Sequence, residues 1–296
     1  MNSNMETNTL FGLFETDYNK LEAFDLKRIS IPGINEHLLK EMFSCIDLTS
    51  LNTQDSTNSI EEFCEKVARF SEVFPSVPQV AAVCVYPVFA SIPTSKLKGR
   101  NIKRAVVSAG FPSSQTFLNN KIEETRRAIF LGANEIDIVI SVGEFLEGNY
   151  EFVANEIASI KEIMGKAHLK VIIETGALKL QDDIWKASIL AMEAGADFIK
   201  TSTGKMSPAA TPEAAWVMTH AIKAYAAKRS RAVGFKAAGG ISTVNDALVY
   251  WAIQKEVLGE KYLNNTLFRF GTSRLANILL TEIEKCKGTN KEINYF

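Results

Sequence analysis

The chain has 296 residues, of which 46% are hydrophobic and 23% are charged, a composition typical of a globular protein that buries a large core. Its length suits a single α/β domain. The net charge of −1 gives no basic surface for nucleic acid, and no apolar run approaches the roughly 20 residues that cross a bilayer, so we expect neither partner.

Residues 1–41 are expected to form a helical N-terminal extension. The start, MNSNMETNTL, is polar and acidic and lacks the basic and apolar regions of a secretory leader, which predicts a cytoplasmic protein. Helix-like segments at 19–30 and 34–42 are separated by Pro32 and Gly33. We expect the extension to close the bottom of the domain that follows; the alternative is a homodimer contact.

From residue 42 onward, short runs rich in β-branched residues alternate with amphipathic segments. The runs predicted as strands are 42–48, 79–86, 104–110, 135–141, 170–176, 197–203, 231–237 and 268–273. Between them, segments such as 212–228 repeat apolar residues at three- and four-residue steps, as helices packed on one face do. This alternation predicts a parallel sheet, and its eight units predict one (β/α)8 TIM barrel over 42–288, followed by a tail at 289–296.

An open, doubly wound sheet is the alternative α/β architecture. Such a sheet usually carries a glycine-rich dinucleotide loop after its first strand. Here the first predicted strand is followed by TSLNTQDS at 49–56, which contains no glycine. The closed barrel is therefore favoured.

The cysteines and histidines are scattered along the chain. No spacing among the four cysteines matches a zinc or redox motif, and the three histidines lie far apart. Metal sites are usually built from clustered histidines, cysteines and carboxylates. We therefore expect free thiols and no metal.

Two lysines lie near the ends of neighbouring predicted strands, where barrels of this class carry their active sites. Lys200 lies in DFIKTSTGK at 197–205, and Lys236 lies in VGFKAAGG at 233–240. A lysine amine attacks a carbonyl only when neutral, and burial or a nearby ammonium lowers its pKa. A single strand lysine is more often a surface side chain, but two on adjacent strands predict one ammonium that keeps the other amine neutral.

Two carboxylates accompany the lysines. Asp137 alternates with Ile136 and Ile138, so it is expected to face the barrel interior. It is a candidate for proton relay through a water molecule, or else a structural ion pair. Glu174, in the run at 170–176, is expected to support the site by pairing with Lys200 or Lys236.

Three turns after predicted strands are rich in glycine and hydroxyl groups. Backbone N–H groups in such turns, and at helix N-termini, bind anions, which predicts a phosphate site. The turns contain Thr203, Gly204 and Lys205 after the sixth strand, Gly239 and Gly240 after the seventh, and Gly271 and Ser273 after the eighth.

The first two predicted strands hold weaker candidates for substrate contact. Asp47 and Thr49 end the first strand and either hydrogen-bond substrate hydroxyls or cap the following loop. Cys84, in the second strand, either borders the substrate or is a small core residue.

These motifs resemble the deoxyribose-phosphate aldolase family. The similarity runs from about Cys45 to the last barrel helix and includes IDLTSLN at 46–52, NEIDIVI at 134–140, GADFIKTSTGK at 195–205 and GFKAAGG at 234–240. It implies a (β/α)8 barrel that reversibly cleaves 2-deoxy-D-ribose 5-phosphate to D-glyceraldehyde 3-phosphate and acetaldehyde, in deoxyribose catabolism and without a cofactor. It also implies that Lys200 forms the Schiff base, Lys236 lowers its pKa and Asp137 relays protons.

The resemblance has departures and leaves rival functions open. Ser242 stands where many relatives have arginine, and Arg274 stands where some have a second serine, which predicts an altered phosphate site. The terminal Tyr295 is a candidate proton donor folded over the site. The rivals are another Schiff-base aldolase or transaldolase with a different donor, and a non-catalytic sugar-phosphate-binding barrel, which would not need the lysine pair.

Overall fold

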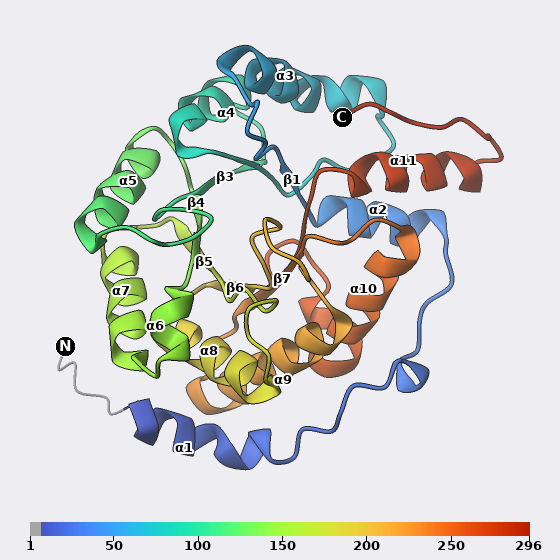
Figure 1. Ribbon diagram of the computed structural model, residues 1–296. Helices are drawn as coiled ribbons and strands as arrows, with labels where there is room; N and C mark the ends of the chain where they lie inside the picture. The colour runs from blue at the N-terminus through green and yellow to red at the C-terminus, as the bar shows by residue number, and fades with distance from the viewer. Residues whose placement is uncertain (1–6) are drawn as a thin grey trace.

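The computed structural model describes residues 7–296 and shows a closed barrel of eight parallel strands inside a ring of helices (Figure 1). Each strand pairs with the next in the chain, and the last pairs with the first, which confirms the predicted (β/α)8 architecture. The strands are β1 (Ile46–Thr49), β2 (Ala82–Val85), β3 (Lys103–Val107), β4 (Glu135–Val139), β5 (His168–Ile172), β6 (Phe198–Lys200), β7 (Gly234–Ala238) and β8 (Phe268–Thr272).

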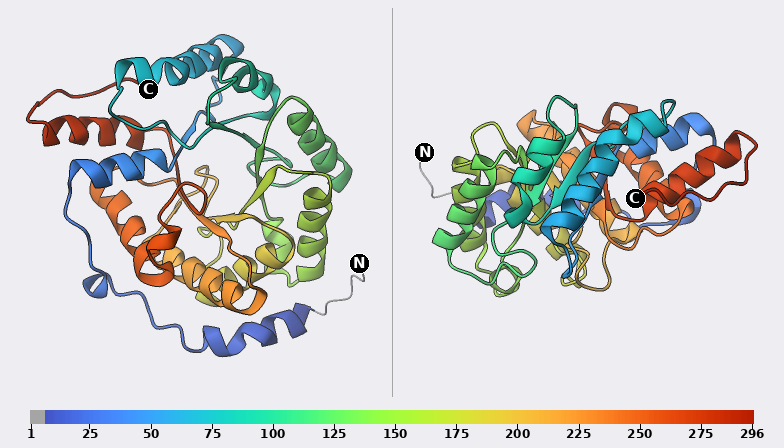
Figure 2. Two further views of the ribbon diagram at one scale, coloured as in Figure 1. Left: turned by 180° about the vertical axis from the view of Figure 1, so that it is seen from behind. Right: turned by 90° about the horizontal axis from the view of Figure 1, so that it is seen from above.

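The helices surround the strands, and the two further views show the ring from behind and from its side (Figure 2). They are α2 (Glu36–Ser44), α3 (Thr57–Val73), α4 (Ser91–Lys96), α5 (Leu118–Phe130), α6 (Val142–Leu146), α7 (Tyr150–Glu162), α8 (Gln181–Glu193), α9 (Pro212–Arg229), α10 (Val244–Leu258) and α11 (Leu275–Cys286). Among residues 7–296, no helix combines the length and apolar character that crossing a membrane requires.

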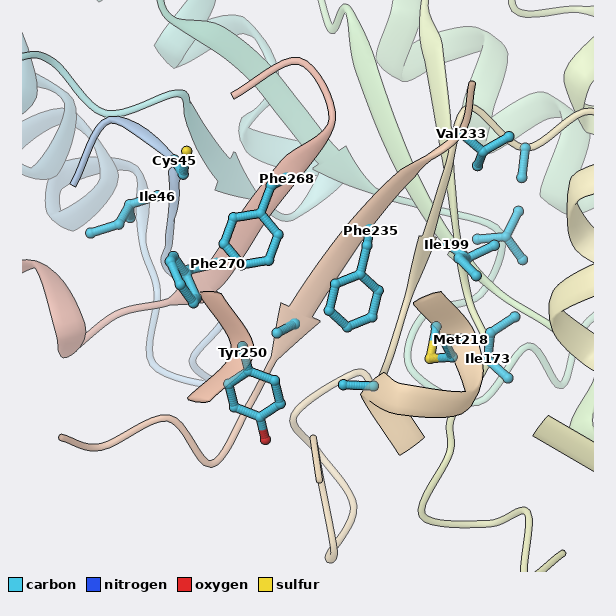
Figure 3. Close-up of a cluster of buried hydrophobic side chains, with 14 of the residues drawn as sticks. Cys45, Ile46, Ile173, Ile199, Met218, Val233, Phe235, Tyr250, Phe268 and Phe270 are labelled. Carbon is cyan, nitrogen blue, oxygen red and sulfur yellow. The ribbon is translucent and has the colours of Figure 1, made fainter. Parts of the chain in front are cut away.

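Side chains alternate between the two faces of each strand, and the outward ones form the core beneath the helices. Phe235 of β7 and Phe268 of β8 are fully buried and stacked, with ring centroids 6.2 Å apart. Figure 3 shows them between the strands and Tyr250 of α10 and Met218 of α9. This packing explains why the predicted strands are rich in large apolar residues at every second position.

The inward side chains are unusual for a barrel, whose interior is normally filled by branched apolar residues. One part of the interior is small and apolar and comes from β2 and β3: Ala82, Cys84, Ala105 and Val107. The rest includes seven buried ionisable side chains from β1 and β4 to β8: Asp47, Glu135, Asp137, Lys170, Lys200, Lys236 and Arg269. We call these seven residues the charge cluster.

The N-terminal extension differs from its prediction. Its first helix, α1 (Thr7–Tyr18), lies on the outer surface of the ring, against α8 and α9, and does not close the bottom of the barrel (Figure 1). Phe14 is fully buried there and stacks on Tyr225 of α9, with ring centroids 6.1 Å apart. The aromatic residues of α1 therefore determine where the extension docks.

The prediction of a helix over 19–30 is wrong. Only a short 3-10 turn, η1 (Leu26–Arg28), forms in this segment. The backbone carbonyl of Glu22 accepts a hydrogen bond from the Trp216 indole, 2.9 Å long, which holds this segment against α9. The second predicted helix exists as α2, but it continues through Ser44, so residues 42–44 are helical and β1 begins only at Ile46.

The C-terminal tail returns to the outside of α3, where the chain ends (Figure 1). The Tyr295 hydroxyl donates a hydrogen bond of 2.7 Å to the carbonyl of Lys66, and Phe296 stacks on Phe70 at 5.6 Å. The backbone N–H groups of Tyr295 and Phe296 bind the Asn277 side chain. In this structure Tyr295 therefore lies on α3 and not over the barrel mouth.

Candidate active site

A cavity of about 410 Å³ opens at the C-terminal ends of the strands, a volume suited to a small metabolite. Ten of its lining residues come from the strand ends and turns singled out in the sequence: Thr49, Lys200, Thr203, Gly204, Lys205, Gly239, Gly240, Ser242, Gly271 and Ser273. Arg274 also lines it. The structure thus brings the predicted lysine and the predicted phosphate turns around one space.

Lys200 ends β6 and is the member of the charge cluster that lines this cavity. The residue is only 4% exposed, and Nζ lies 2.9 Å from Oδ2 of Asp137. Burial lowers the pKa of Lys200, the Asp137 carboxylate opposes that effect, and the Lys236 ammonium lowers the pKa further, so that it lies below its ordinary value. Lys200 is therefore an amine with access to a ligand and an increased neutral fraction.

Lys236 lies beside Lys200 in the register of β6 and β7, as predicted. Its Nζ is 2.8 Å from Asp137 and 2.6 Å from Asp47. Burial lowers the pKa of Lys236, but these two carboxylates raise it above its ordinary value. Lys236 is therefore the member of the pair that holds a proton more strongly, and Lys200 is the one that loses it more readily.

Gly271 of β8 makes room for Lys236. A Cβ atom at this position would lie 2.8 Å from Cε of Lys236 and 2.9 Å from Cβ of Ala238. Any larger side chain would push the lysine out of its place between the two aspartates. Gly271 thus lines the cavity and also leaves the space that the Lys236 side chain occupies.

Asp137 faces the interior, as the alternation in β4 predicts, and it is completely buried. Its two oxygens accept hydrogen bonds from the amines of Lys170, Lys200 and Lys236, at 2.8, 2.9 and 2.8 Å. Burial alone would raise the pKa of Asp137, but the three lysines hold it well below its ordinary value. The carboxylate is therefore ionised and in contact with both lysines of the predicted pair.

Three members of the charge cluster were not predicted from the sequence. Lys170 of β5 is completely buried, and its amine lies 2.7 Å from Glu135 and 2.8 Å from Asp137. Arg269 of β8 binds both Glu135 and Asp47. The signal was present, because Glu135 lies two residues before Asp137 in one strand and must face the same side. Lys170 and Arg269 gave no comparable signal, because each stands near the start of its predicted strand.

The charges of the cluster balance only when Lys200 is neutral. The cluster contains three carboxylates, from Asp47, Glu135 and Asp137, and three cations other than Lys200. These three cations are Lys170, Lys236 and Arg269, and each is in contact with at least two of the carboxylates. Lys200 shares its single carboxylate partner, Asp137, with two other lysines. Charge balance thus favours the unprotonated amine at this one position.

Glu174 does not pair with either lysine, contrary to our expectation. It follows β5 with a left-handed backbone, φ 55°, which turns its side chain toward the loop after β6. There its carboxylate accepts hydrogen bonds from the backbone N–H of Thr203, at 3.1 Å, and from the Thr203 hydroxyl, at 2.6 Å. Glu174 therefore supports the site by fixing a turn, and not through an ion pair.

The glycine turns form the wall of the cavity away from the charge cluster. Gly204, Gly239 and Gly240 all have φ between 76° and 78°, a conformation that favours glycine. At Gly239 a Cβ would lie 2.7 Å from Cβ of Ala209 and 3.1 Å from Cα of Gly204, so the two loops touch through bare backbone. Lys205 reaches across the mouth and donates to the carbonyl of Leu51.

The two candidates in β1 have different positions. Thr49 lines the cavity, and its hydroxyl donates to the carbonyl of Asp47 at 2.9 Å. Asp47 itself is fully buried below the cavity, in contact with Lys236 and Arg269, so the structure places it among the charges and not at the mouth. Burial alone would raise the pKa of Asp47, but Arg269, Lys236 and Lys170 lower it below its ordinary value.

Cys84 of β2 lies in the apolar part of the interior and does not line the cavity. Burial, together with the Asp137 carboxylate, raises the pKa of its thiol to about 11, so the thiol is protonated at neutral pH. This supports its role as a small core residue next to the site.

Comparisons with known proteins agree with this site. The family described as "DeoC/LacD family aldolase" matches residues 42–278. The deoxyribose-phosphate aldolase of Homo sapiens is 41% identical over 250 residues, which cover 81% of this chain and 77% of the human protein. That of Bos taurus is 40% identical over 258 residues, covering 84% and 80%. The crystal structure titled "putative deoxyribose-phosphate aldolase from Coccidioides immitis" superposes on this chain with a TM-score of 0.77 at 25% identity. The superposition covers 95% of this chain and 99% of the other.

The family match spans most of the chain, including every strand of the barrel and the whole charge cluster. The two mammalian relatives are aldolases by name and are similar over more than three quarters of their own length. On these grounds the chain belongs to the DeoC/LacD aldolase family, and it is a lyase of the aldolase type.

Proposed function

We propose that this protein reversibly cleaves 2-deoxy-D-ribose 5-phosphate to D-glyceraldehyde 3-phosphate and acetaldehyde through a Schiff base on Lys200. The observation that carries the proposal is the position of Lys200, which lines the cavity and has a lowered pKa beside Lys236. The names of the human and bovine relatives support the substrate. The mechanism that follows requires no metal or organic cofactor.

In the first half of the reaction, the neutral amine of Lys200 attacks the C1 aldehyde of the open-chain sugar. Proton transfer and loss of water then give an iminium ion. A base removes the proton of the C3 hydroxyl, the C2–C3 bond breaks, and its electron pair moves to the iminium to give an enamine. Glyceraldehyde 3-phosphate leaves as the C3 oxygen becomes an aldehyde.

In the second half, the enamine is protonated at C2, and water hydrolyses the resulting iminium to acetaldehyde and free Lys200. Asp137 is the group we assign to proton transfer, through a bound water, because its carboxylate is 2.9 Å from the Lys200 amine. Lys236 keeps that amine neutral between turnovers.

The phosphate of the substrate is proposed to bind the glycine turns. Gly204, Gly239 and Gly240 present backbone to the cavity, and Ser273 stands just before α11. Arg274 is exposed, borders the same space and supplies a positive charge there. We place the reaction in the cytoplasm, in keeping with four cysteines that are all free thiols.

The proposal is tested by aldol cleavage with Lys200→Ala and, as a matched control, Lys179→Ala, an exposed lysine at the same end of the barrel. We expect Lys200→Ala to lower kcat by about 10³-fold or more, because no other group forms the iminium, while Lys179→Ala stays within twofold of the unaltered protein. Comparable turnover by both variants would contradict the proposal. A preference for dihydroxyacetone phosphate over acetaldehyde in the synthetic direction would indicate the rival donor class.

A further inference from the structure

A second ion pair lies in the barrel below the residues that the proposed mechanism uses. Nη2 of Arg269 is 2.9 Å from Oε1 of Glu135, and Nη1 is 3.3 Å from Oε2, a two-pronged contact between a guanidinium and a carboxylate. The side chains are 3% and 0% exposed. Neither residue lines the cavity, so neither can touch a substrate bound there.

Each member of this pair also holds one residue of the layer above. Arg269 binds Asp47, which lies 2.6 Å from the Lys236 amine. Glu135 lies 2.7 Å from the Lys170 amine, which in turn donates to Asp137 at 2.8 Å. Two chains of contacts therefore start at the pair and meet at Asp137.

We propose that Arg269 and Glu135 are positioning residues, which hold the charges around Lys200 so that this lysine remains the one base of the cluster with a single carboxylate partner. The inference rests on the proposed Schiff-base role of Lys200. It assigns a role in the reaction to a pair that contacts neither substrate nor the reacting amine.

The charge cluster is buried, so its positive and negative groups must balance one another. The groups that face Lys200 are Asp137 of β4, Lys236 of β7 and the Cys84 thiol of β2, with Asp47 and Lys170 behind them. A buried charge without a partner costs several kcal/mol, so the cluster favours the protonation state in which its charges balance. Removing one fixed charge must then change the affinity of Lys200 for a proton.

The two charges of the pair should act in opposite directions. Without the Arg269 cation, three carboxylates face two cations, and a proton on Lys200 restores the balance, so the pKa of Lys200 rises. Without the Glu135 carboxylate, three cations face two carboxylates, and a proton on Lys200 becomes less favourable, so its pKa falls. A purely structural pair would instead lose stability in both variants, with no shift of opposite sign.

The test is the pH dependence of kcat/KM for deoxyribose 5-phosphate, which reports ionisations of the free enzyme. Arg269→Met should move the acid limb upward by about one pH unit, a tenfold loss at a pH on that limb, and Glu135→Gln should move it downward. The double variant should return close to the original midpoint. Arg269→Lys, which keeps the charge, should retain the midpoint even if kcat falls.

Glu156→Gln is the matched control, because Glu156 forms a buried ion pair with Lys121 at 2.5 Å outside the charge cluster. It should lower the melting temperature without moving the pH profile. Shifts of the same sign in Arg269→Met and Glu135→Gln, or no shift in folded variants, would overturn the inference. If Arg269→Met does not fold, Glu135→Gln and the double variant decide, since an unmoved midpoint in Glu135→Gln is sufficient to reject it.

Failure of this inference can be distinguished from failure of the proposed function. The unaltered protein is treated with acetaldehyde and borohydride, and the modified residue is identified. An adduct on Lys200 together with unshifted variants rejects only the positioning role of Arg269 and Glu135. The absence of an adduct in the unaltered protein rejects the Schiff-base mechanism itself.

Discussion

Lys200 and Lys236 have the same side chain and adjacent places in the strand register, yet their surroundings move their pKa values in opposite directions. Both are desolvated, which lowers the pKa of each. The difference lies in the carboxylates, since Lys236 has two within 2.8 Å and Lys200 shares one with two other lysines. The position of Asp47 therefore decides which of the two lysines has the lowered pKa.

Replacing Lys236 tests this assignment. In Lys236→Leu the positive neighbour of Lys200 is lost and Asp137 is freed to stabilise the Lys200 ammonium, so both effects raise the pKa of Lys200. The acid limb of kcat/KM should move upward by at least about one pH unit, because activity needs the neutral amine and each unit lowers its fraction tenfold. An unchanged profile with full activity would contradict the role of Lys236.

Sequence patterns found some members of the charge cluster and missed others. Lys200, Lys236 and Asp137 were predicted because each stands among apolar residues that mark a buried strand. Lys170 and Arg269 lie near the start of their runs, where a charge is normally solvent-exposed. Their burial depends on closure of the barrel, which a local pattern does not reveal.

At the scale of secondary structure, the alternation of strands and helices predicted all eight strands, and errors are confined to their ends and to the first 41 residues. The extension contains two polar helical patterns, and the pattern at 19–30 looked as helical as the one at 34–42. The two segments differ in their tertiary contacts. The Trp216 indole of α9 donates a hydrogen bond to the Glu22 carbonyl, whereas α2 packs against α11. Neither contact is visible in the local sequence.

The docking of α1 is expected to be a stability feature independent of the active site. Phe14→Ala removes a fully buried ring that stacks on Tyr225, which should lower the free energy of unfolding by about 3 kcal/mol or release α1 from the ring. Leu13→Ala, at a neighbouring position that is 45% exposed, should change it by less than about 1 kcal/mol. Chemical denaturation followed by fluorescence measures both; equal effects would show that α1 does not dock through Phe14.

For the molecule as a whole, the charge cluster replaces part of the apolar filling of the barrel. Parallel register brings Asp47 and Arg269 together from opposite ends of the sequence, and this closure explains why the cluster could not be read from single motifs. The arrangement is stable only while its carboxylates are ionised. Stability should therefore depend on pH in a predictable direction.

The pKa values of Asp47 and Asp137 are lower in the folded protein than the ordinary value of about 3.9 in an unfolded chain. Their contribution to folding is thus fully present above about pH 4 and is lost as the pH falls toward the folded values. The free energy of unfolding, measured with urea, should be flat from pH 7 to about pH 5 and fall steeply below about pH 4.

Asp47→Asn should be less stable than the unaltered protein at pH 7 by about 3 kcal/mol, because it leaves buried cations short of a partner, and should show a weaker acid dependence. Glu147→Gln, at an exposed position of the loop after α6, serves as the control and should keep both the stability and the slope. An unchanged acid slope in Asp47→Asn would show that the cluster does not govern acid stability.

The central claim is that Lys200 forms an imine with acetaldehyde, and the most direct measurement is to trap it. The protein is mixed with acetaldehyde, reduced with borohydride, digested and analysed by peptide mass spectrometry. The account predicts an N-ethyl group on Lys200, with Lys170 and Lys236 unmodified because both are held as ammonium ions. An adduct on either of those lysines instead, or none on a well-folded sample, would contradict it.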